Sequence, residues 1–444
     1  MRIVIAGDGE TGTHLARMLS VENQDIVLMG SDTEHLAELE AVSNFMTFEG
    51  NPMSFRDLMR CGVDVADIFV AVTPDETVNI IACQMAKDCG ARRCVARVDN
   101  PEFATPRAEE MLRRNGIEQI IFPEKLAAIE TRRFIEHNWV SQWLQFHGGE
   151  LLVVGVRMES TGSLCGMFLR DIPNNPRLFH VSAIKRGSDI IIPRGEDRLL
   201  EGDTIYFSVL QANIDLLPAM CGKRVSRARR IMVTGAGRVT ENLLDQLGQK
   251  YNMTVIDPNA DRCRKVAEKF PKVVVVNASA NDVNTLKEEG IDGCDTFLAL
   301  TGSSETNIVS CMVAREHGVR RTLARIEELQ YIPEAESLAI DKIINKKLLN
   351  TGKVLSLVLD NNVATSQCLS LDKAEVTEIK VPENSRIVSR PLSELSLPRG
   401  MTVAGLVRDG VGQLAGGHTR LMPGDYVVIF SISGIIAKIE KFFR

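Results

Sequence analysis

The stretch RIVIAGDGETG, residues 2–12, decides the fold of the N-terminal part of this chain. Its apolar run predicts a buried β-strand, and the G-x-G-x-x-G that follows is typical of a loop that leads into a helix. In such a loop one glycine permits a tight turn, one lets the backbone approach a pyrophosphate, and one lets the helix pack on the strand. The N-terminus of the helix offers free N–H groups and a partial positive charge to phosphate. We therefore expect a dinucleotide-binding unit here.

The chain repeats this unit once. RIMVTGAG at 230–237 matches RIVIAGDG at 2–9, and GIDGCDTFLALT at 290–301 matches GVDVADIFVAVT at 62–73, both with an offset of 228 residues. A second kind of segment follows each copy, at 183–207 and again at 405–430, with a different offset. The order of the chain is therefore A–B–A–B, with both kinds of domain duplicated.

Short apolar runs and amphipathic stretches alternate in the first A copy. Strands are expected at 2–7, 25–29, 45–50 and 68–73, and helices at 15–21, at 33–42 and before the last of these strands. This βαβαβ order predicts the α/β class, with a doubly wound parallel sheet in each Rossmann-like domain, whereas the shorter B segments predict small α+β lobes. The expected domains are two Rossmann-like domains at 1–125 and 229–348, lobes at 140–222 and 362–444, and a basic linker at 222–229.

The composition excludes several classes of protein. The chain has 444 residues and a net charge of −6, which argues against a nucleic-acid partner and against sustained binding to an anionic membrane. No segment approaches the ~20 apolar residues of a membrane span, and the N-terminus lacks the pattern of a signal peptide. We therefore expect a cytoplasmic chain that is not inserted in the membrane. The ten cysteines form no C-x-x-C pair and no zinc spacing, so no metal site is expected.

The first candidate site lies where the strands of the first copy end. We expect the G-x-G-x-x-G loop to hold the phosphates and Asp32 to hold the ribose. The pair after the third strand should contact adenine or ribose. Thr73 and Arg97 follow the fourth and fifth strands, at the carboxyl edge of the sheet where the ligand is expected. Gly30 stands where an acid usually grips the ribose, so Asp32 is the nearest acidic substitute; the alternative is that Asp32 only caps a helix. The expected residues are Gly7, Asp8, Gly9, Glu10, Thr11, Gly12, Asp32, Gly50, Asn51, Thr73 and Arg97.

The second candidate site differs from the first. Asp257 ends its second strand and can grip a ribose, but Thr240 replaces the third glycine of the loop, and Arg238 offers a positive charge where Glu10 would repel phosphate. For Arg97 and Arg325 a surface salt bridge is the alternative to a phosphate contact. The expected residues are Gly235, Ala236, Gly237, Arg238, Val239, Asp257, Ser279, Thr301 and Arg325, with Ala278 before Ser279. We expect two non-identical sites.

The sequence shows no convincing catalyst. The seven histidines do not recur at equivalent positions of the repeat, and no G-x-S-x-G, H-E-x-x-H or Walker motif is present. Ligand sites without catalytic groups favour a sensor over an enzyme. Two alternatives remain: an NAD-dependent oxidoreductase, and a free-standing nucleotide sensor that acts on a soluble partner.

The A–B–A–B order, RIVIAGDGETG, the 62–73 run and the two Gly-Asp turns at 202–203 and 424–425 together resemble the regulatory subunits of bacterial Trk potassium uptake systems. Each A–B pair resembles an RCK unit, a KTN-type Rossmann domain followed by a TrkA-C domain. The resemblance implies a cytosolic homo-oligomer, commonly a tetramer, that lies under a TrkH/TrkG-type channel subunit. It also implies binding of NAD(H), with ADP or ATP as further candidates, and gating of potassium flux by the bound nucleotide.

Overall fold

The computed structural model describes residues 1–21, 24–137, 139–173, 175–187, 189–223, 229–248, 250–338, 340–358, 365–368, 374–398, 400–432 and 443. They fall into two compact units, Met1–Arg132 with Ala228–Leu355, and Arg133–Arg227 with Ser356–Arg444. Most of the linker expected at 222–229, and the boundary expected at 362, lie outside the described residues.

The first unit contains two six-stranded parallel sheets with the same topology. Their strand orders are β3-β2-β1-β4-β5-β6 and β14-β13-β12-β15-β16-β17. This is the order of doubly wound dinucleotide-binding sheets, in which the direction of winding reverses between the first and fourth strands. The predicted fold class is confirmed.

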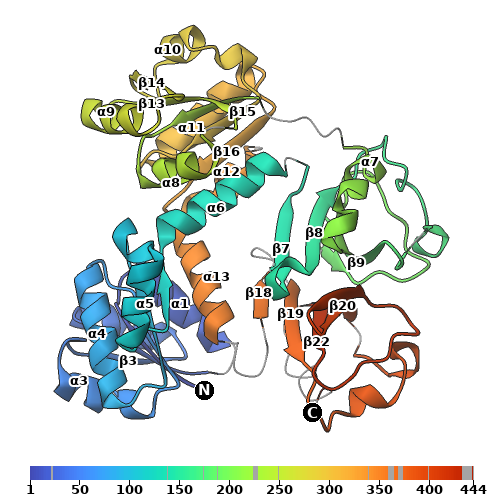
Figure 1. The fold of residues 1–444 in the computed structure, drawn as a ribbon, viewed down its shortest axis with the longest axis horizontal. Helices are drawn as coiled ribbons and strands as arrows, with labels where there is room; N and C mark the ends of the chain where they lie inside the picture. The colour runs from blue at the N-terminus through green and yellow to red at the C-terminus, as the bar shows by residue number, and fades with distance from the viewer. Residues whose placement is uncertain are drawn as a thin grey trace. The chain divides into compact units, whose positions relative to one another are not determined.

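The first sheet consists of β1 (Arg2–Ala6), β2 (Asp25–Gly30), β3 (Met46–Glu49), β4 (Ile68–Ala71), β5 (Arg93–Arg97) and β6 (Gln119–Ile121). Its helices are α1 (Glu10–Val21), α2 (Thr33–Val42), α3 (Phe55–Arg60), α4 (Glu76–Cys89), α5 (Pro106–Arg114) and α6 (Pro123–Glu136). Figure 1 shows α3, α4 and α5 beside the blue strands of this sheet.

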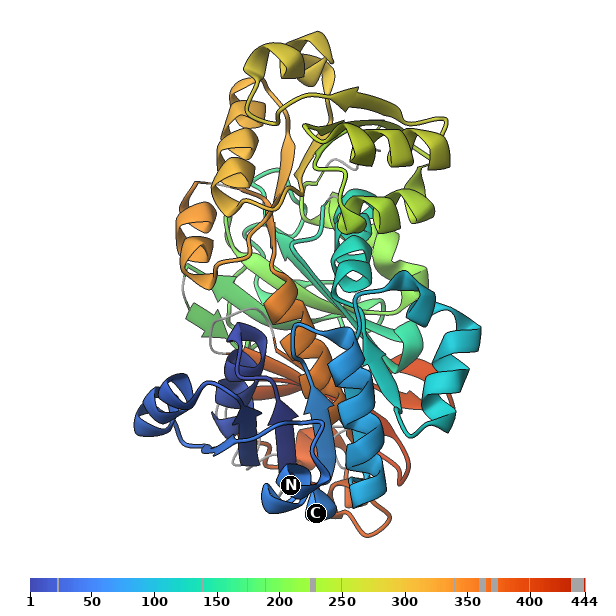
Figure 2. The ribbon, with the colours of Figure 1, turned by 90° about the vertical axis from the view of Figure 1, so that its left-hand side faces the viewer.

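The second sheet consists of β12 (Arg230–Thr234), β13 (Asn252–Asp257), β14 (Val274–Asn277), β15 (Thr296–Ala299), β16 (Arg321–Arg325) and β17 (Lys342–Ile344). Its helices are α8 (Arg238–Leu247), α9 (Ala260–Lys269), α10 (Val283–Glu288), α11 (Ser304–Glu316), α12 (Ile332–Ser337) and α13 (Lys346–Val358). In Figure 2 the strands of this domain run between olive and golden helices on their two sides.

Both sheets are buried on both faces, which explains why their strands read as continuous apolar runs. In β1, for example, Ile3, Val4, Ile5 and Ala6 are all fully buried. Alternate residues of the first sheet share one core with the apolar residues of α3, α4 and α5. The layers place the carboxyl ends of all six strands at one edge.

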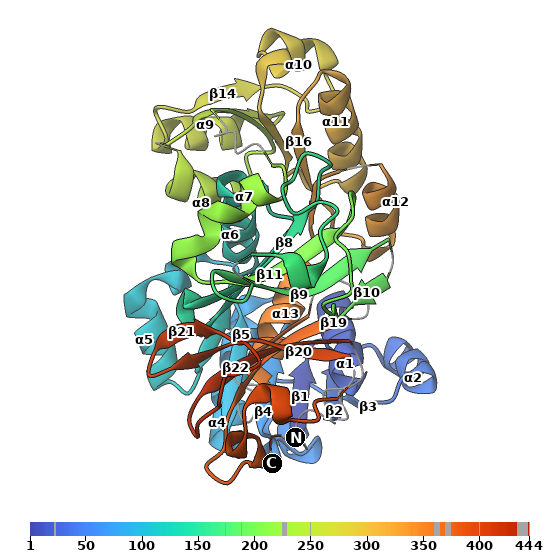
Figure 3. The same cartoon turned by 90° about the vertical axis from the view of Figure 1, so that its right-hand side faces the viewer.

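The second unit contains two five-stranded antiparallel sheets, with orders β10-β9-β11-β8-β7 and β18-β19-β22-β20-β21. Its strands are β7 (Gln142–Phe146), β8 (Leu151–Arg157), β9 (Phe179–Arg186), β10 (Asp189–Ile191), β11 (Thr204–Val209), β18 (Thr365–Cys368), β19 (Ala374–Lys380), β20 (Met401–Arg408), β21 (Val411–Leu414) and β22 (Tyr426–Ile432). The short helix α7 (Leu217–Met220) follows β11. The two sheets share a core to which both contribute aromatic side chains, including Tyr206 and Phe430. Figure 3 shows β9 of one sheet next to β20 of the other.

The two lobes also carry the same ion pair, between an arginine and a buried aspartate. Arg186 clamps Asp203 with Nε and Nη2 at 2.8 and 2.7 Å, and Arg408 clamps Asp425 at the same distances. Both aspartates belong to the Gly-Asp turns that revealed the duplication. Asp203 and Asp425 are buried, so these bidentate contacts stabilise the turn in each lobe. Among the described residues no helix has the length and apolar character that a membrane span needs.

Acidic pH is expected to destabilise the second unit through His180 of β9, whose Nε2 lies 3.4 Å from Thr402 Oγ1 on β20. Burial lowers the pKa of His180 from 6.5 to about 4. Below pH 6.5 the unfolded chain therefore binds a proton that the folded chain does not. The free energy of unfolding falls as the pH falls from 6.5 towards 4, by at most about 1.4 kcal/mol per pH unit for this group.

Urea unfolding followed by tryptophan fluorescence measures this effect, because both tryptophans of the chain, Trp139 and Trp143, lie in the second unit. His180→Gln should reduce the loss of stability between neutral pH and about pH 4.5 relative to the wild type. His418→Gln alters an exposed histidine and should retain the loss. An identical pH dependence in all three proteins would contradict the assignment to His180.

Candidate functional site

The glycine loop of each Rossmann-like domain crosses the end of the neighbouring fourth strand of its sheet. Gly7 has φ 125°, and a Cβ built on it would lie 3.0 Å from the backbone N of Thr73. Gly235 has φ 100°, and its Cβ would lie 2.9 Å from the backbone N of Thr301. Both the left-handed conformation and the close approach require glycine. The loop and the threonine that follows the fourth strand are therefore neighbours at the reversal point of each sheet, where ligands of such sheets bind.

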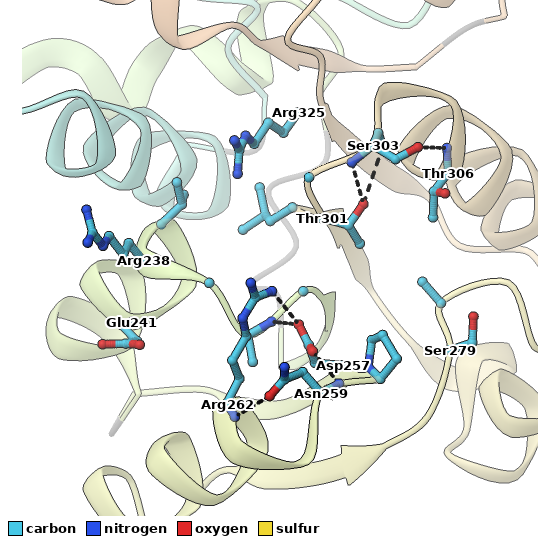
Figure 4. Close-up of a pocket in the computed structure, with 18 of the residues that line it drawn as sticks. Arg238, Glu241, Asp257, Asn259, Arg262, Ser279, Thr301, Ser303, Thr306 and Arg325 are labelled. Atoms are coloured by element: carbon cyan, nitrogen blue, oxygen red, sulfur yellow. Dashed lines mark hydrogen bonds and ion pairs between the residues drawn. The ribbon is translucent and has the colours of Figure 1, made fainter. Parts of the chain in front are cut away.

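The second domain has a cavity of about 760 Å³ at this edge (Figure 4). All nine residues expected at the second site line it: Gly235, Ala236, Gly237, Arg238, Val239, Asp257, Ser279, Thr301 and Arg325. They come from the loop, the first turn of α8, the end of β13 and the segments after β14, β15 and β16. The volume is that of a site for a small organic ligand.

Asp257 is fixed at the floor of this cavity. Its Oδ2 accepts a hydrogen bond from Ala236 N at 2.7 Å, and its Oδ1 accepts one from Asn259 N at 2.8 Å. Figure 4 shows Arg262 beside Asp257. Their Nη1 and Oδ2 atoms lie 3.8 Å apart. Burial, and next the charge of Asp257, raise the pKa of the neighbouring Cys263 thiol. The carboxylate thus ties the end of β13 to the glycine loop.

Positive charge dominates the rest of the lining. Arg325 pairs with Glu327 and still borders the cavity, so the salt bridge considered for it is present. Lys346, at the start of α13, lies 3.2 Å from Glu124 Oε1 and 3.7 Å from Glu327 Oε1. Arg238 donates from Nη1 to the backbone O of Asp99 at 3.1 Å. These cations suit a phosphorylated ligand.

The two loops differ where the sequence predicted a difference. A Cβ on Gly12 would lie 1.8 Å from Gly7 O, so the first loop closes on its helix only with glycine at this position. In the second loop the buried Thr240 donates its hydroxyl to Gly235 O, which fills the same place with a hydrogen bond. Around a Cβ on Gly9 or Gly237 there is open space, as required where a ligand approaches the backbone.

Asp32 lies at the N-cap of α2, where its Oδ1 accepts a hydrogen bond from His35 N at 3.0 Å. Gly50 N donates to Gly30 O, which brings the segment after β3 beside the end of β2. Asn51 closes a local turn, with its N bound to Asp57 and its Oδ1 accepting from Met53 N. Asp32 therefore caps α2, which is the alternative role considered for it from the sequence. Its contact with a ribose stays a prediction.

Two further expected residues of the first site have charged partners. Arg97 donates to the carboxylate of Asp99, with Nη2 and Oδ2 2.9 Å apart, which is the salt bridge considered as its alternative role. Glu10 pairs with Lys347 of α13, from the second Rossmann-like domain. Burial lowers the pKa of Lys347. The repulsion between Glu10 and phosphate, expected from the sequence, is thus offset by a cation of the other domain.

Sequence reasoning missed the residues that hold the edge in place. Asn79 is fully buried; its Oδ1 accepts from Thr73 N and Oγ1, and its Nδ2 donates to Thr73 O and Arg97 O. Asn307 makes the same four hydrogen bonds with Thr301 and Arg325. The recurrence of both asparagines at the repeat offset was the signal for them. Glu124, Lys346 and Lys347 carried no such signal, since Glu124 lines the cavity of the second domain from the first, Lys347 pairs with Glu10 of the first domain from the second, and Lys346 pairs with Glu124 across the two domains.

The fold and these two edges define a tandem Rossmann-type protein with a duplicated candidate site for phosphorylated ligands. The model of the TrkA-N domain matches residues 3–123 and 231–346, and that of the TrkA-C domain matches residues 153–222 and 376–444. The chain belongs to the family of proteins built from TrkA-N and TrkA-C domains. The resemblance inferred from the sequence is thereby confirmed.

The Trk system potassium uptake protein TrkA of Halomonas elongata is 29% identical over 453 residues, which cover 100% of this chain and 99% of that protein. The crystal structure of the GsuK RCK domain matches 100% of this chain and 94% of its own, with a TM-score of 0.61 and 17% identity. The GsuK channel bound to NAD matches 100% of this chain and 78% of its own, with a TM-score of 0.64 and 16% identity. At these identities the two solved structures support the fold.

Proposed function

We propose that this chain is the nucleotide-binding regulatory subunit of a Trk-type potassium uptake system. It binds NAD(H), and ADP or ATP as further ligands, and acts on a TrkH/TrkG-type channel subunit from the cytoplasmic side of the membrane as a homo-oligomer, in the simplest case a tetramer. The proposal is carried by the cavity at the reversal point of the second sheet, in a chain with the tandem TrkA-N and TrkA-C plan. The functional domains are 1–125, 140–222, 229–348 and 362–444.

The residues of the second site fit an adenine dinucleotide or nucleotide. The loop Gly235–Val239 and the first turn of α8 would hold phosphate, with Arg238, Arg325 and Lys346 as cations, and Asp257 would accept from ribose hydroxyls. Ser279 lies where the adenine side is expected. Glu124 also lines the cavity, where its Oε1 lies 3.2 Å from Lys346 Nζ.

A sensor accounts for this lining better than an oxidoreductase. The described residues that line the cavity include no histidine, cysteine or tyrosine, and Lys346, a further candidate acid or base, is paired with Glu124 and Glu327. A regulatory ligand acts through its different affinities for two shapes of the assembly, typically by ~1–3 kcal/mol of coupling. The bound nucleotide therefore changes transport without being consumed.

Calorimetric titration of the full chain with NAD, NADH, ADP and ATP tests the proposal. We expect two binding events per chain with different affinities, because the two loops carry Glu10 and Arg238 at equivalent positions. Steady oxidation of NADH on addition of small oxidants or ketones would favour the oxidoreductase instead. Co-purification with the channel subunit, and potassium flux into proteoliposomes that depends on nucleotide, test the partner. Absence of both results would refute the regulatory role.

A further inference from the structure

The carboxylate that ties the strand to the loop comes from opposite sides in the two domains. In the second domain Asp257, the last residue of β13, accepts from the loop at Ala236 N. In the first domain Asp8, in the loop, accepts with Oδ2 from Ser31 N at 2.8 Å and from Asp32 N at 2.9 Å, directly after β2. In each domain a carboxylate therefore joins the glycine loop to the end of the second strand. In the second domain the strand carries the carboxylate and the loop donates, whereas in the first domain the loop carries it and the segment after the strand donates.

The positions involved correspond to each other in the duplication. Asp8 aligns with Ala236 at the offset of 228, and Gly30 and Asp257 are the last residues of β2 and β13. Where the second domain has Ala236 and Asp257, the first has Asp8 and Gly30. The end of β2 has no acidic residue, but Asp8 of the glycine loop places a carboxylate beside it.

The two arrangements exclude each other sterically. A Cβ on Gly30 would lie 2.2 Å from Asp8 Oδ2 and 2.3 Å from its Cβ and Cγ. No real pair of side chains tolerates such distances, so the Asp8 side chain occupies the space that a side chain at position 30 would need. Asp8 is half-buried, and no described residue donates a hydrogen bond to its Oδ1.

We infer that Asp8, and not Asp32, is the ribose-binding and specificity-determining carboxylate of the first site. The inference rests on the proposed nucleotide-binding function. Oδ1 of Asp8 accepts from ribose hydroxyls while Oδ2 stays bound to the backbone after β2, and Asp32 remains the cap of α2. A carboxylate at this place repels a 2′-phosphate, so the first site takes adenine nucleotides with a free 2′-hydroxyl, such as NAD or ADP, and rejects NADP.

The test measures the first site alone, in full-length protein that carries Gly237→Asp to close the second site. Calorimetry with NAD, ADP and NADP is compared for Asp8→Ala, Gly30→Asp and the double variant Asp8→Gly/Gly30→Asp, because only glycine at position 8 also removes the Cβ that a side chain at position 30 would meet. Each single change should weaken binding of NAD and ADP by about 10-fold or more, on the scale of a lost hydrogen bond to a charged group. Asp8→Ala should also reduce the preference for NAD over NADP. The double variant places the carboxylate at the end of β2, as Asp257 is placed at the end of β13, and should recover most of the affinity.

Thermal unfolding of the same variants, without nucleotide, provides a second readout. Gly30→Asp alone should lower the melting temperature because of the collision with Asp8, and adding Asp8→Gly should restore it. A larger loss of affinity in Asp32→Ala than in Asp8→Ala would overturn the inference, and so would a double variant no better than Gly30→Asp. If the wild-type chain binds no nucleotide at either site, the proposed function fails instead, which separates the two results.

Discussion

Gly237→Asp is expected to abolish nucleotide binding at the second site while the protein stays folded. Gly237 has φ −87° and ψ −176°, which any residue adopts, and a Cβ on it meets open space. The aspartate therefore fits the backbone, but its side chain enters the space above the N-terminus of α8 with a negative charge. We expect the affinity for NADH or ATP at this site to fall by about 100-fold or more, because a phosphate contact is replaced by repulsion between like charges.

Calorimetric stoichiometry measures this result directly. Gly237→Asp should leave one binding event per chain, which belongs to the first domain, and Gly9→Asp should leave the complementary event. Gly352→Asp adds the same charge at an exposed position of α13 that does not line the cavity, and should keep both events. If either loop variant retains both events with unchanged affinity, the phosphate position is wrongly assigned.

Asn307→Ala is expected to cause the largest loss of stability among the changes considered. The side chain is fully buried and makes four hydrogen bonds, which fix Thr301 and the end of β16. Alanine leaves these buried partners unsatisfied, at a cost of about 3 kcal/mol in the free energy of unfolding of the first unit. The affinity at the second site should fall as well, because Thr301 is no longer held against the loop.

Scanning calorimetry measures the cost, and Asn79→Ala should show a loss of the same order from the first domain, whose network is the same. Asn284→Ala replaces an exposed asparagine on α10 and should change stability by less than about 0.5 kcal/mol. A loss for Asn307→Ala no larger than that for Asn284→Ala would show that the network contributes little.

Local patterns were enough to predict the Rossmann-like sheets and the duplication. Buried parallel strands must be apolar along their whole length, so runs such as 2–6 and 230–234 identify them, and the glycine loops mark where ligand-binding edges lie. The nine residues expected at the second site do meet around one cavity, because the carboxyl ends of parallel strands share an edge. Their role in holding a nucleotide stays a prediction.

The parts that the sequence did not reveal depend on distances between segments. The first domain carries its carboxylate in the loop, at Asp8, and not at the end of β2, at Gly30. This difference becomes clear only from the collision between Asp8 and a Cβ placed on Gly30. The pairing of Glu10 with Lys347 joins two domains, and no periodicity along the chain encodes which surfaces of two domains meet. The four hydrogen bonds of Asn79 could not be predicted from the sequence, because they depend on where the ends of β4 and β5 lie. The recurrence of this asparagine at the repeat offset, as Asn307, showed only that the position is shared by both domains.

The contact between Glu124 and Lys346 shows that the cavity of the second domain depends on both Rossmann-like domains. Glu124 opens α6 of the first Rossmann-like domain, yet it lines the cavity of the second. The segment 229–348 therefore does not encode the whole wall of its own cavity. An excised second domain would lose Glu124, which is an acidic wall residue and one of the two carboxylate partners of Lys346, so its ligand affinity would describe a different, more cationic surface. Both Rossmann-like domains therefore contribute side chains to the wall of this one cavity.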